Sequence, residues 1–319
     1  MYPWLTPVWQ RLLRGVRAQH LGHGLLIKGM AGLGKRELAG QLANALLCQH
    51  TSNAPCGMCH ACELTAAGSH SDLHIVGREG RSIGIDAIRE LSRIMSESAR
   101  LGHGKVAIIE RAELMTEAAA NALLKTLEEP AGEATLILVS SQPERLLPTL
   151  ISRCQQWLVP LPDTRTVLTW LKEQGAQASA AALSVNQGSP LQTLDYLNAG
   201  ADDKRLQLLS ELSDLAGHPA LFARVQATLQ EQPVHLVWVQ LLLQDALQTA
   251  LGVQAPLKLD DCRADSVRLA RLSPVCLNRL NSELLELRRS LQPGQGRPMN
   301  TGLQLGQWLH SLQQALLHS

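Results

Sequence analysis

Four cysteines lie within fifteen consecutive positions and have the spacing of a metal site. The set comprises Cys48, Cys56, Cys59 and Cys62. Four thiolates complete the tetrahedral shell of a structural zinc ion, which has no open position for water. Gly57 supports a tight turn between them, so we predict zinc in segment 48–62. Three alternatives remain open: the thiols could be reduced and metal-free, two of them could form a redox pair, or a nearby histidine could replace one ligand. The nearby histidines are His50, His60 and His70.

A glycine-rich segment follows a short apolar run and precedes a helical pattern. Residues 29–35 read Gly-Met-Ala-Gly-Leu-Gly-Lys, which fits the first seven positions of the phosphate-binding motif GxxxxGK[ST]. In such a loop, backbone N–H groups and the helix N-terminus bind phosphates. The candidate nucleotide contacts are Gly29, Gly32, Gly34 and Lys35. The eighth position is Arg36, and a guanidinium has no lone pair for magnesium. The sequence leaves open whether Lys35 still supports ATP binding or belongs to an ordinary turn.

A second acidic position lies after the apolar run 106–109. Active phosphate-loop ATPases hold magnesium with a carboxylate at this position. In one branch of these ATPases, a neighbouring glutamate also positions the attacking water. Glu110 can replace the first carboxylate, but Arg111 stands at the second place and stays protonated. Glu113 lies further along. We therefore expect no Mg-ATP hydrolysis, although a buried strand that leads into a charged loop has the same pattern.

The elements around these motifs predict an α/β domain. Short apolar runs at 25–27, 73–76, 106–109 and 136–139 alternate with helical patterns, as in a parallel sheet with flanking helices. Thr116 is placed to cap one of the helices, which Pro130 ends. After residue 161 the strand pattern stops. We predict a phosphate-loop domain over residues 1–161, a small helical lid over 162–202 and an all-α domain over 203–319.

Composition limits the possible roles. The chain has 319 residues, an odd total of seven cysteines and a net charge of +1. A protein that grips nucleic acid unaided is usually strongly basic, so we expect any DNA contact to be shared with partners. We find no signal-peptide pattern and no apolar run of membrane-spanning length, and we expect a cytoplasmic protein.

Several segments together resemble the bacterial clamp-loader AAA+ family. One is Asn-Ala-Leu-Leu-Lys-Thr-Leu-Glu-Glu-Pro at 121–130, and another is Leu-Leu-Pro-Thr-Leu-Ile-Ser-Arg-Cys at 146–154. The cysteine insertion after the loop helix is a third, and the start Tyr-Pro-Trp-Leu at 2–5 resembles one kind of subunit in that family. The resemblance covers about residues 1–200, whereas the remainder matches only in length and helical character.

This resemblance implies an AAA+ module, a lid and a helical collar. It also implies that Arg153, in the Ser-Arg-Cys motif, reaches the ATP site of a neighbouring subunit, where an arginine stabilises charge on the transferring phosphoryl group. Leu191 stands where motor subunits carry a nucleotide-contacting arginine. With Arg36 and Arg111, this favours a stator without intrinsic activity in a DNA-directed DNA polymerase holoenzyme. The implied partners are motor subunits of tau or gamma type, a clamp-opening delta subunit, the sliding clamp and primed DNA.

Two other functions remain open at this stage. The chain could be an active ATPase motor of the same ring, which an ATPase assay would reveal. It could instead be a zinc-dependent nucleic-acid-binding module, because a four-cysteine site permits that role. The near-neutral charge and the lack of an aromatic and basic surface pattern disfavour the module.

Overall fold

The computed structural model describes residues 1–101, 104–130, 132–291 and 300–318. The chain divides into two compact units, Met1–Thr166 and Val167–Ser319, which are described separately below. The predicted all-α domain over 203–319 includes residues 292–299 and 319, which lie outside the described residues. Within the described ranges, no helix combines the length and apolarity that a bilayer span requires.

The first unit is built on a parallel sheet of five strands. The strands are β1 (Gly24–Lys28), β2 (Leu73–Val76), β3 (Lys105–Ile109), β4 (Ala134–Ser140) and β5 (Gln155–Leu158). Their order is β2-β3-β4-β1-β5. The register pairs Leu26 with Leu138 of β4 and with Gln156 of β5. β1 and β4 therefore lie inside the sheet, and their carboxyl ends meet at one edge.

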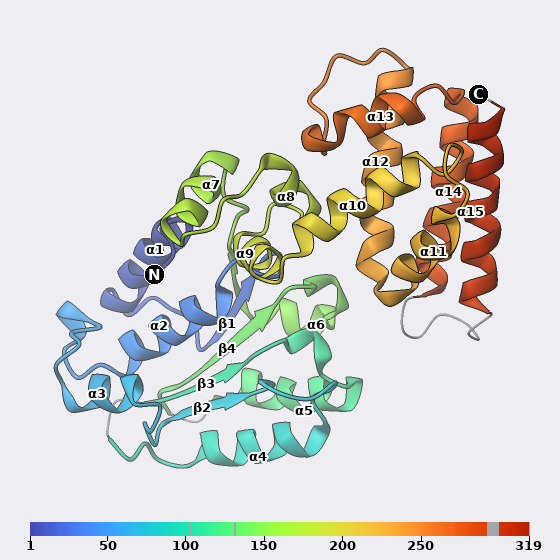
Figure 1. The fold of residues 1–319 in the computed structure, drawn as a ribbon. Helices are drawn as coiled ribbons and strands as arrows, with labels where there is room; N and C mark the ends of the chain where they lie inside the picture. Colours follow the sequence, from blue (N-terminus) through green and yellow to red (C-terminus); the bar gives the residue numbers. More distant parts are fainter. Residues whose placement is uncertain (102–103, 131, 292–299, 319) are drawn as a thin grey trace. The chain divides into compact units, whose positions relative to one another are not determined.

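Helices cover both faces of this sheet (Figure 1). The helices of the unit are α1 (Thr6–Arg17), α2 (Lys35–Leu47), α3 (His60–Ala66), α4 (Ile85–Ser96), α5 (Glu117–Glu128) and α6 (Pro148–Ile151). α2 lies on one face, whereas α4 and α5 lie on the other (Figure 1). Because both faces are covered, the inner strands carry continuous apolar runs rather than an alternating pattern. In β1, Leu25, Leu26 and Ile27 are all fully buried.

Local sequence signals place the ends of α5. The Thr116 hydroxyl accepts a hydrogen bond from the N–H of Ala119 at 3.2 Å, as its predicted capping role requires. On the inner side, Leu123 and Leu127 join the core that also contains Leu26. The helix therefore has a fixed position against the sheet, with its first turn close to the carboxyl ends of the strands.

Within its described residues, the second unit contains helices joined by loops and no strands. Helix α7 (Thr164–Glu173) contains the boundary between the units, and the others are α8 (Ala180–Val185), α9 (Pro190–Asn198), α10 (Ala201–Ser213), α11 (Leu221–Glu231), α12 (Pro233–Ala250), α13 (Arg263–Leu269), α14 (Pro274–Ser290) and α15 (Thr301–Leu317). Leucines from α10, α12, α14 and α15 form its core. Arg205 is fully buried and pairs with Asp202 and Asp261, so its charge is compensated.

Candidate functional site

The glycine-rich loop joins β1 to α2, as the sequence predicted. Gly29, Gly32 and Gly34 all have positive φ, of +151°, +71° and +78°. A Cβ atom on Gly29 would lie 2.6 Å from the carbonyl oxygen of Val159, so the loop cannot accept a larger residue there without moving. The loop therefore has the backbone of a phosphate-binding turn at the N-terminus of a helix.

The Lys35 side chain folds back over this loop. Its ammonium donates hydrogen bonds to the carbonyl oxygens of Gly29 and Met30, at 2.7 and 2.5 Å, and to the hydroxyl of Ser141 at 3.0 Å. Burial lowers the pKa of Lys35 to about 8, and the negative charge of Glu113 opposes that shift. Lys35 thus satisfies its donors within its own loop and the end of β4.

Arg36 is paired with the acidic residue at the end of the neighbouring strand. Its Nε lies 3.0 Å from Oε1 of Glu110, and the Nε of Arg78 lies 3.4 Å from the same oxygen. The Glu110 side chain is only 9% exposed, whereas the two arginines are 63% and 52% exposed. Two guanidinium groups therefore surround one nearly buried carboxylate. The net charge of the three side chains is positive.

Arg111 turns toward the loop that follows β2. It adopts a left-handed conformation with φ +52°, and both its Nε and its Nη2 donate to the carbonyl oxygen of Gly77, at 3.0 and 2.8 Å. A Cβ atom on Gly77 would lie 2.2 Å from the carbonyl oxygen of Glu110, so the two strand ends approach closely because residue 77 is glycine. Arg111 ties these ends together, and its permanently charged guanidinium cannot accept a proton from water.

Ser141, which the sequence did not single out, completes this edge beside Ser140. Ser141 accepts from Lys35, and its backbone N–H donates to Oε1 of Glu113 at 3.2 Å. The Ser140 hydroxyl accepts a hydrogen bond from the N–H of Gln142 at 3.1 Å. Ser141 could have been found because it directly follows a buried strand at the same edge as the loop.

A magnesium ion does not fit this arrangement. Oxygen ligands are required, and Arg36 presents a cationic group where a hydroxyl would bind the metal. Oε1 of Glu110 is already shared by two guanidinium groups. The edge of the sheet therefore retains a phosphate-loop backbone but has replaced the metal-binding chemistry with ion pairs.

The segment before α1 packs against the same loop. The indole N–H of Trp4 donates to the carbonyl oxygen of Leu33 at 2.9 Å, and the rings of Tyr2 and Trp4 stack with centroids 5.1 Å apart. A Cβ atom on Gly34 would lie 2.4 Å from the Tyr2 ring. The aromatic pair thus covers the loop next to the first turn of α2.

The four cysteines of the insertion converge, as predicted. Their sulfur atoms all lie within 4.8 Å of one another, and two pairs, Cys48 with Cys59 and Cys56 with Cys62, are 4.0 Å apart. Zinc–sulfur bonds of about 2.3 Å in a tetrahedron require sulfur separations of about 3.8 Å. The donor set therefore suits a tetrahedral metal.

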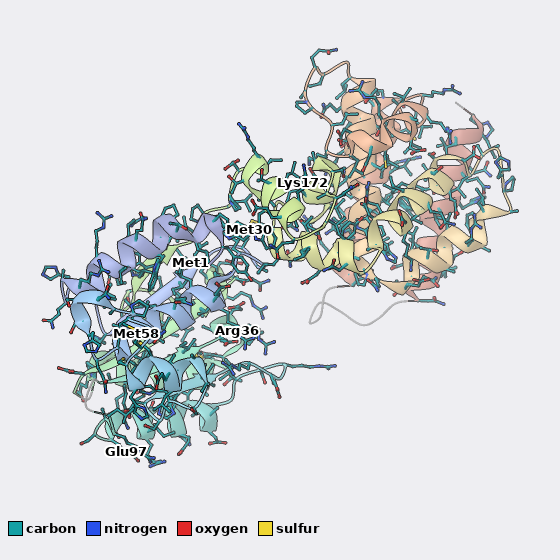
Figure 2. All side chains as sticks on the ribbon, turned by 60° about the vertical axis from the view of Figure 1, so that its left-hand side comes forward. Met1, Met30, Arg36, Met58, Glu97 and Lys172 are labelled. Atoms are coloured by element: carbon teal, nitrogen blue, oxygen red, sulfur yellow. The ribbon has the colours of Figure 1, made fainter. Side chains whose placement is uncertain are left out.

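Helix ends position these thiols. Cys48 directly follows α2, Cys59 directly precedes α3, and Cys62 lies in the first turn of α3. The N–H groups of His50 and Cys56 both donate to the sulfur of Cys48 at 3.4 Å, which fixes the position of this sulfur. None of the candidate histidines belongs to the cluster among the described residues. Met58, labelled in Figure 2, is 80% exposed between two of the ligands.

Arg153 lies just beyond α6, at the opposite end of β1 from the glycine loop. Its Nη2 is 2.5 Å from Oε1 of Glu128, and its Nη1 donates to the carbonyl oxygen of Thr149 at 3.0 Å. The side chain is 37% exposed, whereas the neighbouring Cys154 is buried. Arg153 therefore lies away from the chain's own phosphate loop. The length of β1 separates the two, because Arg153 lies near its amino end and the loop follows its carboxyl end.

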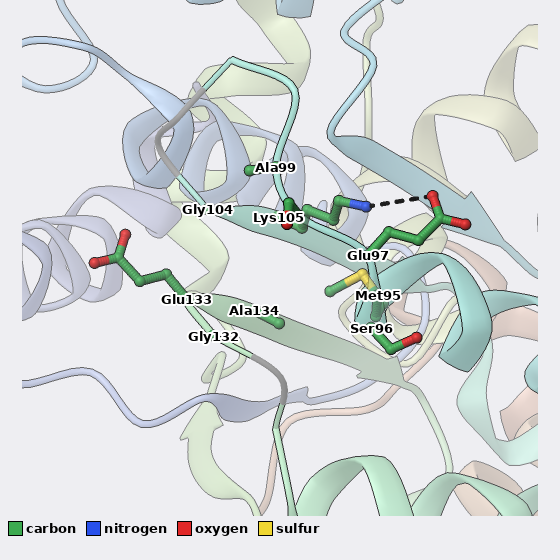
Figure 3. Close-up of a pocket in the computed structure, with 10 residues that line it drawn as sticks. Met95, Ser96, Glu97, Ala99, Gly104, Lys105, Gly132, Glu133 and Ala134 are labelled. Carbon is green, nitrogen blue, oxygen red and sulfur yellow. Dashed lines mark ion pairs between the residues drawn. The ribbon is translucent and has the colours of Figure 1, made fainter.

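One further cavity lies at the opposite edge of the sheet and is not part of this site. It has a volume of about 140 Å³ and lies at the amino ends of β3 and β4 (Figure 3). Lys105 points toward Glu97 there, with 4.0 Å between the charged atoms, and also donates to the carbonyl oxygen of Ile94. The glycine loop lies at the carboxyl ends of the strands, so this cavity is on the other edge.

Comparison with known proteins identifies the family to which this chain is similar. A model described as "DNA polymerase III, delta subunit" matches residues 4–162, and its C-terminal counterpart matches residues 199–314. DNA polymerase III subunit delta' of Escherichia coli is 35% identical over 91% of this chain and 89% of its own length. The Pseudomonas aeruginosa protein of the same name is 42% identical over 67% of each chain. Given this identity over most of its length, the chain belongs to the DNA polymerase III subunit delta' family.

Proposed function

We propose that this chain is a non-hydrolysing stator subunit of the DNA polymerase III clamp loader, where it helps load the sliding clamp onto primed DNA. The pairing of Arg36 with Glu110 carries the proposal, because it removes the magnesium ligands from an otherwise preserved phosphate loop. Arg111 removes the catalytic carboxylate as well. An active motor subunit needs both groups, so this alternative is disfavoured.

The proposal includes a role for Arg153 at another subunit's ATP site. The guanidinium is partly exposed and lies away from the chain's own loop, so it is available to a neighbour. An arginine suits this task because its planar fork stays charged and contacts two phosphate oxygens. The partners in this proposal are tau- or gamma-type motor subunits and the clamp-opening delta subunit, in the cytoplasm.

Two structural roles complete the proposal. Zinc held by the four cysteines would join the end of α2 to the start of α3. Residues 162–202 would act as a lid and residues 203–319 as a collar for ring assembly. ATP binding by Lys35 is not part of the proposal, because its ammonium already donates to two carbonyl oxygens of the loop and to the Ser141 hydroxyl.

ATP turnover tests the proposal. The isolated chain should show no magnesium-dependent hydrolysis, while a complex reconstituted with it should hydrolyse ATP when clamp and primed DNA are added. Native mass spectrometry would establish that the chain is present in that complex. Turnover by the isolated chain that Lys35→Ala abolishes would favour the motor instead.

A further inference from the structure

Arg153 is held at two points by its own subunit, and one of them is a carboxylate. Nη2 pairs with Glu128 at 2.5 Å, and Nη1 donates to the carbonyl oxygen of Thr149 at 3.0 Å. We propose that Glu128 is a positioning residue that orients the Arg153 guanidinium for the neighbouring subunit's phosphate. This inference rests on the in-trans role proposed above for Arg153.

Buried packing sets the backbone positions of the two residues in this pair. Glu128 ends α5 directly after Leu127, which is buried, and the ring of His23 donates to the Leu127 carbonyl oxygen at 2.6 Å. A Cβ atom on Gly24 would lie 2.7 Å from the Leu127 side chain and 3.2 Å from the Arg153 carbonyl oxygen. Glycine at the start of β1 therefore allows the end of α5 and the residue after α6 to approach each other.

The contribution of this pair to folding is expected to be small. The side chains are 37% and 49% exposed, and ion pairs of such exposure add little to stability. An arginine side chain, however, loses much of its conformational freedom when it is fixed. Orienting it before the phosphate arrives removes part of that loss from the reaction. Of its five N–H donors, those not engaged by Glu128 and Thr149 remain for phosphate oxygens.

The test compares Glu128→Ala, Glu128→Gln and Arg153→Ala in the reconstituted complex. If Glu128 orients the guanidinium, Glu128→Ala should lower kcat for clamp- and DNA-stimulated ATP hydrolysis by roughly three- to tenfold, less than the 10²-fold that misplaced groups can cost. KM for ATP should stay unchanged. Glu128→Gln should restore most of the rate, because the amide oxygen still accepts from the guanidinium. The double variant should be no slower than Arg153→Ala.

Glu129→Ala is the matched control, because this adjacent exposed glutamate forms no ion pair within the described residues. Its complex should hydrolyse ATP at the unmodified rate. Unmodified or faster turnover with Glu128→Ala, while Arg153→Ala slows the complex, would overturn the positioning role and leave the in-trans role intact. Equal rates for Arg153→Ala and the unmodified protein would overturn both.

Discussion

Arg36 and Glu110 join the first turn of α2 to the carboxyl end of β3, with 3.0 Å between Nε and Oε1. In a phosphate-loop ATPase these two positions hold one magnesium ion between them. Here the cation is a side chain of the protein itself. The absence of a hydroxyl at position 36 and the presence of a carboxylate at position 110 are thus connected. The Glu110 carboxylate neutralises the arginine that stands in place of the hydroxyl.

We predict energetic coupling between these residues. Arg36→Ala should destabilise the chain by about 1 kcal/mol or less, because the arginine is largely exposed and Arg78 remains beside the carboxylate. Glu110→Gln should cost about 1–3 kcal/mol, because it removes a charged acceptor that is nearly buried. A double-mutant cycle by urea denaturation should give a coupling of about 0.5–1 kcal/mol. Additive effects would show that the contact contributes nothing.

The sheet was largely predictable from sequence because its inner strands are covered on both faces. Continuous apolar runs at 25–27, 106–109 and 136–139 mark β1, β3 and β4. β5 was not predicted, because it begins with two glutamines and only Trp157 among its four residues is buried. Helix α3 was also missed, since it is short and begins within the cysteine insertion.

The convergence of the cysteines could be predicted because neighbouring thiols are separated by few residues. The ion pairs at the sheet edge could not, since they join residues distant in sequence. Nothing in the sequence connects Arg36 with Glu110, or Glu128 with Arg153, until the strand order brings them together. Gly77 shows the same limit, because its need for glycine arises only from the approach of Glu110.

We predict one zinc ion per chain in protein purified under reducing conditions without chelator. Cys59→Ser should lower the zinc content and make the insertion sensitive to proteolysis, because structural zinc contributes about 10–16 kcal/mol of apparent binding energy in small motifs. Cys276→Ser is the control, since this thiol lies in α14, outside the cluster. Metal analysis that finds no zinc in the unmodified chain would contradict the prediction.

Lys35 should make the stability of the chain depend on pH. Its pKa is about 8 in the folded protein because of burial, against an ordinary value of 10.5. Between these values the unfolded chain binds more protons, so stability rises with pH as the folded-state lysine becomes neutral. Relative to Lys35→Met, the unmodified protein should gain stability from pH 8 to 10 and show no such gain below pH 7.

Urea denaturation at pH 6, 7, 8, 9 and 10 measures this difference. The comparison with Lys35→Met cancels other groups that titrate in the same range. Lys125→Met, at an exposed position of α5, is the control and should follow the unmodified protein throughout. A constant difference between the unmodified protein and Lys35→Met from pH 6 to 10 would show that burial does not lower the pKa of this ammonium.

The last prediction concerns which cation serves at position 153. Fingers supplied in trans contribute roughly 10³–10⁵ to the rate in other phosphoryl-transfer systems, so losing one should be visible even if only one of several sites is affected. Arg153→Ala should lower clamp- and DNA-stimulated ATP hydrolysis by the complex and slow clamp loading. Arg153→Lys should rescue poorly, because a point charge cannot contact two oxygens as a planar fork does.

Folding, zinc content and ring assembly should be unchanged in both Arg153 variants, because the side chain is partly exposed and its ion pair contributes little to stability. Native mass spectrometry and metal analysis of the reconstituted complex would verify this before rates are compared. Full activity with Arg153→Lys would mean that charge alone is needed, so that the fork has no role. Full activity with Arg153→Ala in an intact complex would mean that the residue is a surface charge, since no other function would remain for it at the neighbouring site.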